Sequence, residues 1–470
     1  MTARKDIFLN AFTMNCVGHI NHGLWTHPRD RSQDYTTIGY WTELARTLEA
    51  GLFDAVFIAD IVGVYDVYGG SIDLTAREAI QLPVNDPTLL VPAMAAVTEH
   101  LGFGVTVNTA VEHPYTFARR FSTLDHLTDG RIGWNIVTGY LDSAARAVGR
   151  DAMAEHDERY DRADDYLDFL YKLWETSWDE DAVRRDKDAR VFADPAAIHE
   201  IRHDGPYYKG RGYHLSEPSP QRTPVLFQAG TSGRGQRFAA RHAECVFISA
   251  SDPEAARRTA RELRAAVVAA GRRADDIRIF VGLSVVTGAT DAEAEERLLD
   301  YVAHASPEAG LAHFAAGSGI DFSRYGPDDE IAYGPTNAIQ STTAAARRKG
   351  LSKRQLLDGL KLGGRYPLLV GSGDTVAAEM ARWVDEGEID GFNLTRTVVP
   401  ECWHDVTRFV VPALQARGRY KTAYAEGTLR RRLLGEGDRL APRHAGASAH
   451  LSARTASAAA PASHLSLKVS

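Results

Sequence analysis

Cysteine is scarce in this chain of 470 residues, which contains only Cys16, Cys245 and Cys402, far apart in the sequence. An odd number of cysteines without CxxC spacing indicates neither a disulfide framework nor a cysteine-based zinc site. Such usage is typical of a reducing compartment, and we expect a cytoplasmic location.

Long apolar runs are also missing. Hydrophobic residues make up 44% of the chain and charged residues 25%, as in ordinary globular proteins. No stretch is long enough to span a bilayer, so we expect no membrane association. Asn10 interrupts the apolar segment 7–12 and no cleavage site follows, which argues against a signal peptide. A net charge of −8 without a basic stripe argues against nucleic acid as a partner.

The glycine-rich fingerprints GxGxxG and GxxxxGK[ST] are absent as well, whereas an alternation of strand and helix patterns is present. The eight strand candidates are Ile7–Thr13, Ala55–Asp60, Gly104–Thr109, Arg131–Thr138, Pro224–Gly230, Cys245–Ala250, Ile277–Thr287 and Gly391–Arg396. Repeated βα units predict parallel strands, and eight such units close most economically into a barrel. An open doubly wound sheet would usually carry a glycine fingerprint after its first strand. The predicted fold is therefore α/β, a (β/α)8 TIM barrel.

Three intervals are too long for ordinary loops, namely 61–86, 175–223 and 306–367. We expect them to be insertions over the C-terminal strand ends, where lids form. Residues 1–435 are thus predicted to form a single domain. Ala, Ser, Arg and His dominate residues 436–470, and this segment has too few large apolar residues to fold alone. We predict a disordered C-terminal tail.

Polar residues that end the strands are the first candidates for a site, because parallel barrels place the active site at the carboxyl ends of their strands. Asp60 ends the second predicted strand, and Thr106 and Asn108 lie in the third. After the fifth strand, Thr231 and Ser232 begin a helix with free backbone N–H groups. Such a helix start can bind a phosphate, but an ordinary N-cap gives the same pattern, and both interpretations stay open.

A dense charge run, HDERYDRA at residues 156–163, opens another helix. Its simplest interpretation is a solvated face with intrahelical ion pairs. His22, Trp25 and His27 follow the first strand and are candidates for the substrate pocket, although packing within the loop explains them equally simply.

The stretch His199–His203 matches HExxH, the signature of zinc hydrolases. The motif needs a helix so that both histidines face one metal ion. Asp204-Gly205-Pro206 follows at once and breaks any helix, so zinc hydrolysis is kept only as a minor alternative and no metal is expected.

Several long motifs, in order along the chain, carry a resemblance to a known family. They are HGLWTHP at 22–28, AAVTEHLGFGVTVNT at 95–109, LTDGRIGWNIVT at 127–138, HDERYDRADDYL at 156–167, FADP at 192–195, VLFQAGTSGRG at 225–235, DGFNL at 390–394 and VVPALQARG at 410–418. The sequence resembles the nitrilotriacetate monooxygenase, dibenzothiophene-sulfone monooxygenase and pristinamycin synthase group of the luciferase-like flavin monooxygenases. The resemblance extends from the first strand to about residue 434.

This resemblance implies an enzyme that binds reduced FMN and uses molecular oxygen to oxidise a small organic substrate through a flavin (hydro)peroxide. The cofactor residues that it implies are Asp60, Thr106, Asn108, His156, Tyr160, Thr231 and Ser232. It also implies a homo-oligomer. The missing dinucleotide fingerprint predicts that FMNH2 comes from a separate NAD(P)H:flavin reductase. The insertion at 306–367 is expected to be a lid that keeps water out.

Two further alternatives remain open. Deazaflavin-dependent oxidoreductases share this barrel, and fold analogy alone does not separate them from FMN enzymes. A degenerate barrel that only binds flavin is the other. The sequence leaves open whether carbon, nitrogen or sulfur is oxidised, because the substrate pocket is built from loops.

Overall fold

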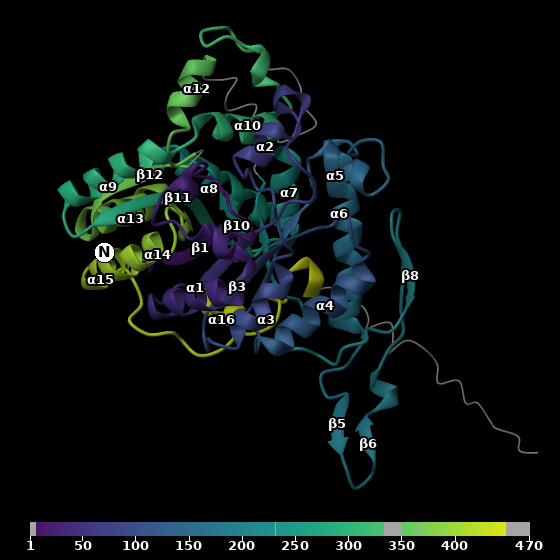
Figure 1. Ribbon diagram of the computed structural model, residues 1–470. Coiled ribbons are helices and arrows are strands. Elements are labelled where there is room, and N and C mark those ends of the chain that lie inside the picture. Colours follow the sequence, from purple (N-terminus) through teal and green to yellow (C-terminus); the bar gives the residue numbers. More distant parts are fainter. Residues whose placement is uncertain (1–5, 231, 333–349, 365, 448–470) are drawn as a thin grey trace, which may run out of the picture.

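The computed structural model describes residues 6–230, 232–332, 350–364 and 366–447 (Figure 1). Thr231, which we predicted as a cofactor residue, lies outside these ranges. So do residues 333–349 of the third insertion and residues 448–470 of the predicted tail.

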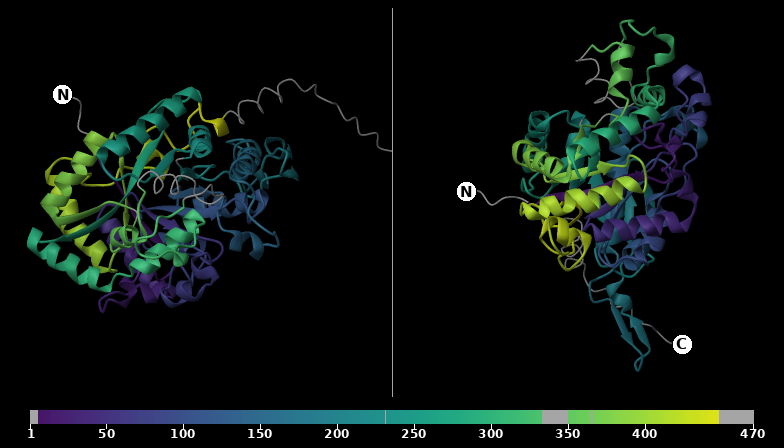
Figure 2. Two further views of the ribbon diagram at one scale, coloured as in Figure 1. Left: turned by 90° about the horizontal axis from the view of Figure 1, so that it is seen from above. Right: turned by 60° about the vertical axis from the view of Figure 1, so that its left-hand side comes forward.

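Eight parallel strands form a closed barrel with helices around it, which confirms the predicted fold (Figures 1 and 2). The strands are β1 (Phe8–Met14), β2 (Ala55–Ala59), β3 (Gly102–Asn108), β4 (Ile132–Val137), β9 (Val225–Gln228), β10 (Cys245–Ile248), β11 (Arg278–Gly288) and β13 (Gly391–Thr395). They pair in this order, and β13 closes the barrel by pairing with β1. All eight predicted strands are present, and none of their ends differs from the prediction by more than two residues.

Aromatic rings fill the interior of the barrel. Phe12, Phe57, Phe227, Phe247 and Phe280 are buried together in one cluster. Small residues on neighbouring strands leave room for the rings: a Cβ at residue 133 of β4 would lie 2.7 Å from the ring of Phe227. Helix α16 (Leu429–Leu434) adds two leucines to this cluster and covers the amino ends of β3 and β4.

The principal surrounding helices are α1 (Ile38–Ala50), α4 (Pro114–Leu127), α6 (His156–Tyr171), α7 (Gly233–His242), α8 (Pro253–Ala269), α9 (Asp291–His304) and α13 (Gly373–Gly387). The segment between β2 and β3 also contains the short α3 (Val91–Ala95). An extra strand, β12 (Leu368–Ser372), was not predicted; it pairs with the outer half of β11, which continues beyond the barrel. Within the described ranges, no helix combines the length and the apolar character that crossing a bilayer requires.

Two of the three insertions lie over the carboxyl ends of the strands, as expected. Residues 61–86 contain α2 (Asp73–Arg77), and the described part of 306–367 contains α10 (Pro307–Ser318) and α12 (Lys353–Gly359). The two insertions contact each other: the backbone N–H of Gly69 donates to Asp321 Oδ1 at 2.8 Å, and Tyr68 OH donates to Glu308 Oε1 at 2.9 Å.

The insertion at 175–223 differs from the expectation. It connects the end of α6 to the start of β9, so its two ends lie at the amino ends of the strands, but its middle reaches the opposite end of the barrel, where Tyr208 OH donates to the backbone oxygen of Thr109, just after β3, at 3.3 Å. It forms two hairpins, β5–β6 (Val183–Asp186 and Val191–Ala193) and β7–β8 (Ile201–Asp204 and Lys209–Gly212). Figure 1 shows β5–β6 as an arm that projects away from the barrel.

The start of the predicted tail is also different, because residues 436–447 pack on the barrel. Leu440 and His444 are buried, and His444 Nε2 donates to the backbone oxygen of His242 at 2.8 Å. Arg443 forms an ion pair with Asp276. The prediction of a disordered segment from residue 436 is therefore wrong for these twelve positions, because their few apolar and charged side chains contact the barrel.

Candidate active site

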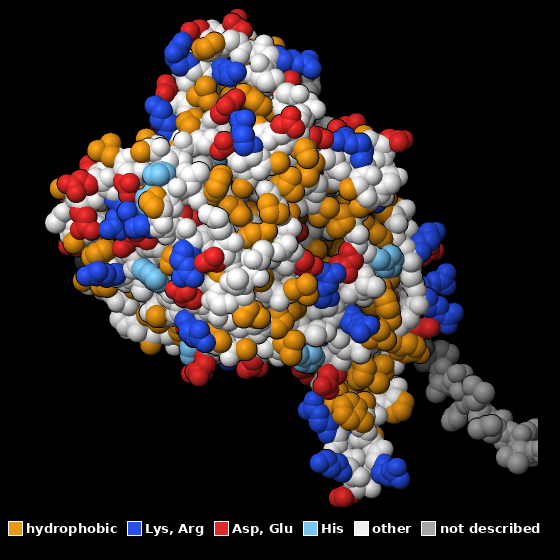
Figure 3. Space-filling view, in the orientation of Figure 1, with side chains coloured by type: hydrophobic (Ala, Val, Ile, Leu, Met, Phe, Trp, Pro, Cys, Tyr) orange, Lys and Arg blue, Asp and Glu red, His pale blue; other side chains and the backbone are white. Residues whose placement is uncertain are grey.

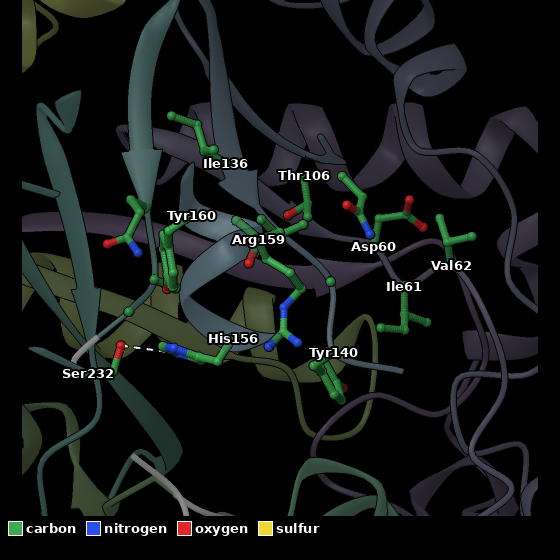
Figure 4. A pocket seen from close by; sticks show the side chains of 17 residues that line it. Asp60, Ile61, Val62, Thr106, Ile136, Tyr140, His156, Arg159, Tyr160 and Ser232 are labelled. Carbon is green, nitrogen blue, oxygen red and sulfur yellow. Dashed lines mark hydrogen bonds between the residues drawn. The ribbon is translucent and has the colours of Figure 1, made fainter. Parts of the chain in front are cut away.

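A cavity of about 920 Å3, measured to its open mouth, lies at the carboxyl ends of β2, β3, β4 and β9 (Figure 4). Six of the seven predicted cofactor residues line it: Asp60, Thr106, Asn108, His156, Tyr160 and Ser232. Residues that are up to 172 positions apart in the sequence thus share one cavity, because strand ends and helix starts meet at this end of the barrel.

His156, Tyr160 and Ser232 form one end of the cavity (Figure 4). His156 and Tyr160 lie in the first turns of α6, one helical turn apart and therefore on one face. Ser232 is the N-cap of α7: its Oγ accepts the N–H of Gly235 at 3.0 Å and lies 3.3 Å from His156 Nε2. Ser232 can therefore cap α7 and still be a contact for a phosphate.

Glycines keep this end of the cavity open. A Cβ at Gly230 would lie 2.8 Å from Tyr160 OH, and a Cβ at Gly235 would lie 2.9 Å from the same oxygen. Burial raises the pKa of Tyr160, although Ser232 and Arg159 act against that shift. Its hydroxyl therefore keeps its proton at neutral pH and is available as a donor.

Ion pairs hold α6 and α7 together beside this end. Arg234, in the first turn of α7, donates to Asp161 at 2.8 Å and also contacts Asp164 of α6. His242, the last residue of α7, donates to Asp164 at 2.8 Å. The charge run at 156–163 is thus only in part the solvated face that we predicted, since part of it fixes the distance between two helix starts.

The other end of the cavity is formed by strand-end residues. Asn135 Nδ2 donates to Thr106 Oγ1 at 2.9 Å, which orients the hydroxyl. Asn108 Oδ1 accepts a hydrogen bond from the N–H of Ala110 at 2.9 Å, so the amide nitrogen of Asn108 points away from this loop bond. Burial raises the pKa of Asp60 to about 6; the N–H of Ile61 lowers it and the charge of Asp86 raises it further.

Several residues of the wall were not predicted from the sequence. Arg159 lies between the two ends in Figure 4, and no lysine or second arginine accompanies it among the described lining residues. It belongs to the same motif as His156, where the surrounding charges concealed it. Apolar side chains and one phenol complete the wall: Ile61, Val62, Ile136, Val137 and Tyr140. Of these, Tyr140 follows a strand end by three residues, which was a usable signal.

A chain of aromatic and polar contacts leads from Tyr140 into the upper insertions. The hydroxyls of Tyr140 and Tyr65 are 3.4 Å apart, and Tyr65 OH donates to Gln81 Oε1 at 2.6 Å. The ring of Tyr65 stacks on His313 of α10 with 4.9 Å between centroids. His313 Nδ1 lies 3.0 Å from His22 Nε2. His22 is therefore connected to the wall of the cavity through His313 and the two tyrosines.

None of the three predicted substrate residues, His22, Trp25 and His27, is among the residues that line the cavity. His27 is buried against α9, where its Nε2 donates to Asp300 Oδ2 at 3.0 Å. The N–H of Arg29 donates to His27 Nδ1 at 3.2 Å, so both ring nitrogens are engaged in packing the loop. Trp25 is half-buried. The structure thus favours the packing interpretation for His27.

Two groups of described residues are candidates for a metal site. His27, Asp300 and His304 place ligand atoms within 4.8 Å of one another, but Arg29 also donates to Asp300, at 2.9 Å. The HExxH stretch forms strand β7 where the zinc motif needs a helix. Its His203 donates to Asp165 at 2.8 Å and stacks on Phe169. Neither arrangement supports a zinc hydrolase.

Taken as chemistry, the cavity offers hydrogen-bond donors at a helix start for an anion at one end, and a hydroxyl, an amide and a carboxyl at the other. Apolar side chains lie alongside. This combination suits an elongated ligand with a phosphate at one end and a polar ring system at the other, with space for a small apolar molecule beside it.

Comparisons with known proteins agree with this arrangement. Residues 20–388 match the family described as Luciferase-like monooxygenase. The chain is 48% identical to the dimethyl-sulfide monooxygenase of Hyphomicrobium sulfonivorans over 439 residues, which cover 93% of this chain and 92% of that protein. It is 49% identical to the long-chain alkane monooxygenase of Geobacillus thermodenitrificans (strain NG80-2) over 436 residues, which cover 92% and 95%. A riboflavin lyase, crystallised with modified FMN and riboflavin, superposes with a TM-score of 0.90 at 38% identity, over 95% of this chain and 99% of that one.

Proposed function

Because the chain belongs to the luciferase-like monooxygenase family and is a monooxygenase of that kind, we propose that it is the oxygenating component of a two-component system. It takes FMNH2 from a separate NAD(P)H:flavin reductase and uses molecular oxygen to oxidise a small organic substrate. The observation that carries the proposal is the single cavity in which His156, Tyr160 and Ser232 face Asp60 and Thr106.

The residues of this cavity fit FMN. The start of α7 and the hydroxyls of Tyr160 and Ser232 are donors suited to the phosphate, and the two glycines leave space beside them. Asp60, Thr106 and Asn108 offer partners for the polar edge of the ring or for the ribityl chain. Reduced FMN, when bound, supplies the electrons that activate oxygen. The protein orients the cofactor and keeps water away.

Water exclusion is assigned to the two upper insertions. Tyr65, Leu74, Leu141, Ala309 and Ala312 form an apolar cluster behind the wall of the cavity, with contributions from both insertions. Apolar surface at this place keeps a reactive centre dry and so suppresses wasteful release of hydrogen peroxide. The lid role that the sequence predicts is therefore assigned, as part of the proposal, to the described part of the insertion at 306–367.

The substrate that this wall suits is neutral and weakly polar. Ile61, Val62, Ile136 and Val137 present hydrocarbon to the cavity, and Tyr140 presents one hydroxyl. Arg159, the one arginine among the described lining residues, lies between the two ends (Figure 4). A single guanidinium leaves most charges of a polyanionic substrate without a partner, so such a substrate would lose much of its hydration uncompensated. Sulfides and alkanes, the substrates named for two relatives, meet this requirement.

The test is an oxygen-uptake assay in which a flavin reductase supplies FMNH2. We expect uptake that depends on a neutral sulfide, sulfone or alkane and is absent with aminopolycarboxylates. Anaerobic titrations should show binding of FMNH2 in preference to reduced deazaflavin. Rapid oxidation of NADH by the purified chain with FMN alone would contradict the need for a reductase. Binding of FMNH2 without any substrate-dependent uptake would indicate a degenerate barrel.

We also propose a homo-oligomer, and the β5–β6 arm supports it. A two-stranded hairpin has marginal stability in water, yet Phe192 and Val191 of this arm are 63% and 37% exposed. Figure 3 shows hydrophobic side chains along the arm and basic ones toward its tip. Light scattering should show that Phe192→Asp dissociates the oligomer, whereas Leu299→Asp, on the exposed face of α9, leaves it intact. Equal masses for wild type and Phe192→Asp would remove the arm from the interface.

A further inference from the structure

We propose that His156 takes up a proton when the phosphate of FMN binds, so that the chain recognises FMN through an imidazolium and selects it over riboflavin in a pH-dependent way. The inference rests on the proposed function, because it concerns the phosphate end of the same cavity. Taking up a proton together with the phosphate is a role that the non-titrating hydrogen-bond donors around His156 cannot perform.

The hydrogen bonds of His156 define where its proton lies. Nδ1 is 2.7 Å from Asp157 Oδ1, and a carboxylate only accepts hydrogen bonds, so Nδ1 carries the hydrogen. The opposite tautomer would set a lone pair of the ring against the carboxylate. The hydrogen bond from His156 is also the main reason why the pKa of Asp157 lies below its usual range. In the neutral ring, Nε2 is therefore an acceptor.

The partner of Nε2 agrees with this assignment. Ser232 Oγ accepts the N–H of Gly235 at 3.0 Å and lies 3.3 Å from His156 Nε2, so the serine hydroxyl can donate its hydrogen to that nitrogen. Figure 4 shows this contact at the edge of the cavity. An acceptor nitrogen thus faces the place that we assign to the phosphate.

A phosphate dianion offers only acceptor oxygens, and an acceptor nitrogen repels it. One additional proton on the line between Nε2 and a phosphate oxygen turns this repulsion into a charge-assisted hydrogen bond. Asp157 stabilises the resulting imidazolium from the other side of the ring. Tyr160 does not provide this proton to the ring, because burial keeps its own proton in place.

The charges around His156 allow this change. Asp157 and Asp161 of α6 are negative, while Arg159 of α6 and Arg237 of α7 are positive. Arg234 of α7 is neutralised by its ion pairs with Asp161 and Asp164. The nearby tyrosine, Tyr160, has its ring centroid 5.3 Å from that of His156. Of these described arginines, Arg159 is the one that lines the cavity together with His156.

Isothermal titration calorimetry tests the proposal on the full chain. Reduced FMN is titrated anaerobically at about pH 8, where a free imidazole is mostly neutral, in two buffers that differ in their enthalpy of ionisation. We expect uptake of about one proton per FMN and none with reduced riboflavin, which lacks the phosphate. Between about pH 7 and 8.5 the affinity for FMN should fall by up to tenfold per pH unit, while that for riboflavin stays constant.

The matched variant is His156→Gln, whose amide donates a hydrogen bond without titrating. It should bind FMN within about tenfold of the wild type but without proton uptake and without the pH dependence. Equal uptake with riboflavin, or unchanged uptake in His156→Gln, would overturn the proposal. FMN binding without any uptake would overturn it as well and leave the proposed function intact. Absence of FMN binding would overturn both.

Discussion

The two ends of the cavity are built in different ways. The phosphate end consists of the first turns of α6 and α7, two regular helices fixed to each other by Arg234 and Asp164. The substrate end consists of strand termini and two insertions, in which Tyr65 and His313 meet from distant parts of the chain. One end offers polar donors, which suit a constant chemical group, and the other is lined with hydrocarbon, which suits a variable substrate.

This difference explains why the two ends suit different tasks. Donors at helix starts are held by backbone geometry, so they present the same arrangement to any phosphate that binds there. Insertions tolerate changes in sequence because they lie outside the ladder of barrel strands. Relatives that act on different substrates can therefore share the phosphate end while their substrate ends diverge.

The largest expected effect tests the phosphate end. Tyr160→Phe removes a hydroxyl that we assign to the phosphate, and a hydrogen bond to a charged group contributes about 1.5–3 kcal/mol. The affinity for FMNH2 should fall by about 10- to 150-fold, with riboflavin binding unchanged. Anaerobic fluorescence titrations measure both ligands.

Tyr166→Phe is the matched control, because Tyr166 lies on the same helix, is fully buried and does not line the cavity. It should leave both affinities within about twofold. An equal loss in the two variants would show that the helix, and not the hydroxyl of Tyr160, accounts for the effect.

The second prediction concerns the buried carboxyl group of Asp60 at the other end of the cavity. Burial raises the pKa of Asp60 from 3.8 to about 6, so the carboxylate destabilises the folded protein at neutral pH. The stability linked to this group is fully present below about pH 4 and is lost as the pH rises through about 6. Asp60→Asn should therefore stabilise the ligand-free protein by about 2–3 kcal/mol at pH 8.

Urea unfolding at several pH values measures this effect. The advantage of Asp60→Asn should shrink steadily between pH 7 and pH 5, because the wild-type carboxyl becomes protonated. A difference in unfolding free energy that is independent of pH would contradict the assignment, and would point to altered packing at the end of β2.

The same contrast explains what the sequence could predict. Alternating strand and helix patterns were sufficient for the eight barrel strands, because each has a continuous apolar run buried on both faces. Asp60, Thr106, His156, Tyr160 and Ser232 were found because strand ends, a helix start and family motifs coincide there. Arg159 was missed only because a charge run conceals which side chain turns inward.

The substrate end was not predictable in this way. Tyr65, Gln81 and His313 come together through tertiary contacts between insertions, and no local periodicity marks them. The loop residue His27 had the right composition for a site, yet it packs against α9. Leu440 and His444 were assigned to a disordered tail because a sparse apolar pattern does not reveal the barrel surface on which it packs.

The third prediction concerns the open space that Gly230 leaves at the phosphate end. In Gly230→Ala, the new Cβ would lie 2.3 Å from Gln228 Nε2 and 2.8 Å from Tyr160 OH, so both side-chain ends must move. We expect a stable protein with about tenfold weaker binding of FMNH2. Gly233→Ala is the control, since its nearest neighbour would be 3.9 Å away. A parallel loss in Gly233→Ala would mean that the start of α7, and not the cavity, is affected.

The smallest effect is expected at the substrate end. Tyr140→Phe removes the hydroxyl that lies 3.4 Å from Tyr65 OH and leaves the ring in the wall. A hydrogen bond between neutral groups contributes about 0.5–1.5 kcal/mol, so KM for a neutral substrate should rise by about 2- to 10-fold. Because Tyr140 belongs to the wall and not to the helix starts, the affinity for FMNH2 should stay within about twofold. Steady-state oxygen uptake gives KM, and anaerobic titration gives the affinity. If KM rose and the affinity for FMNH2 fell as well, Tyr140 would contact the cofactor, and the boundary between the two ends would lie closer to the upper insertions.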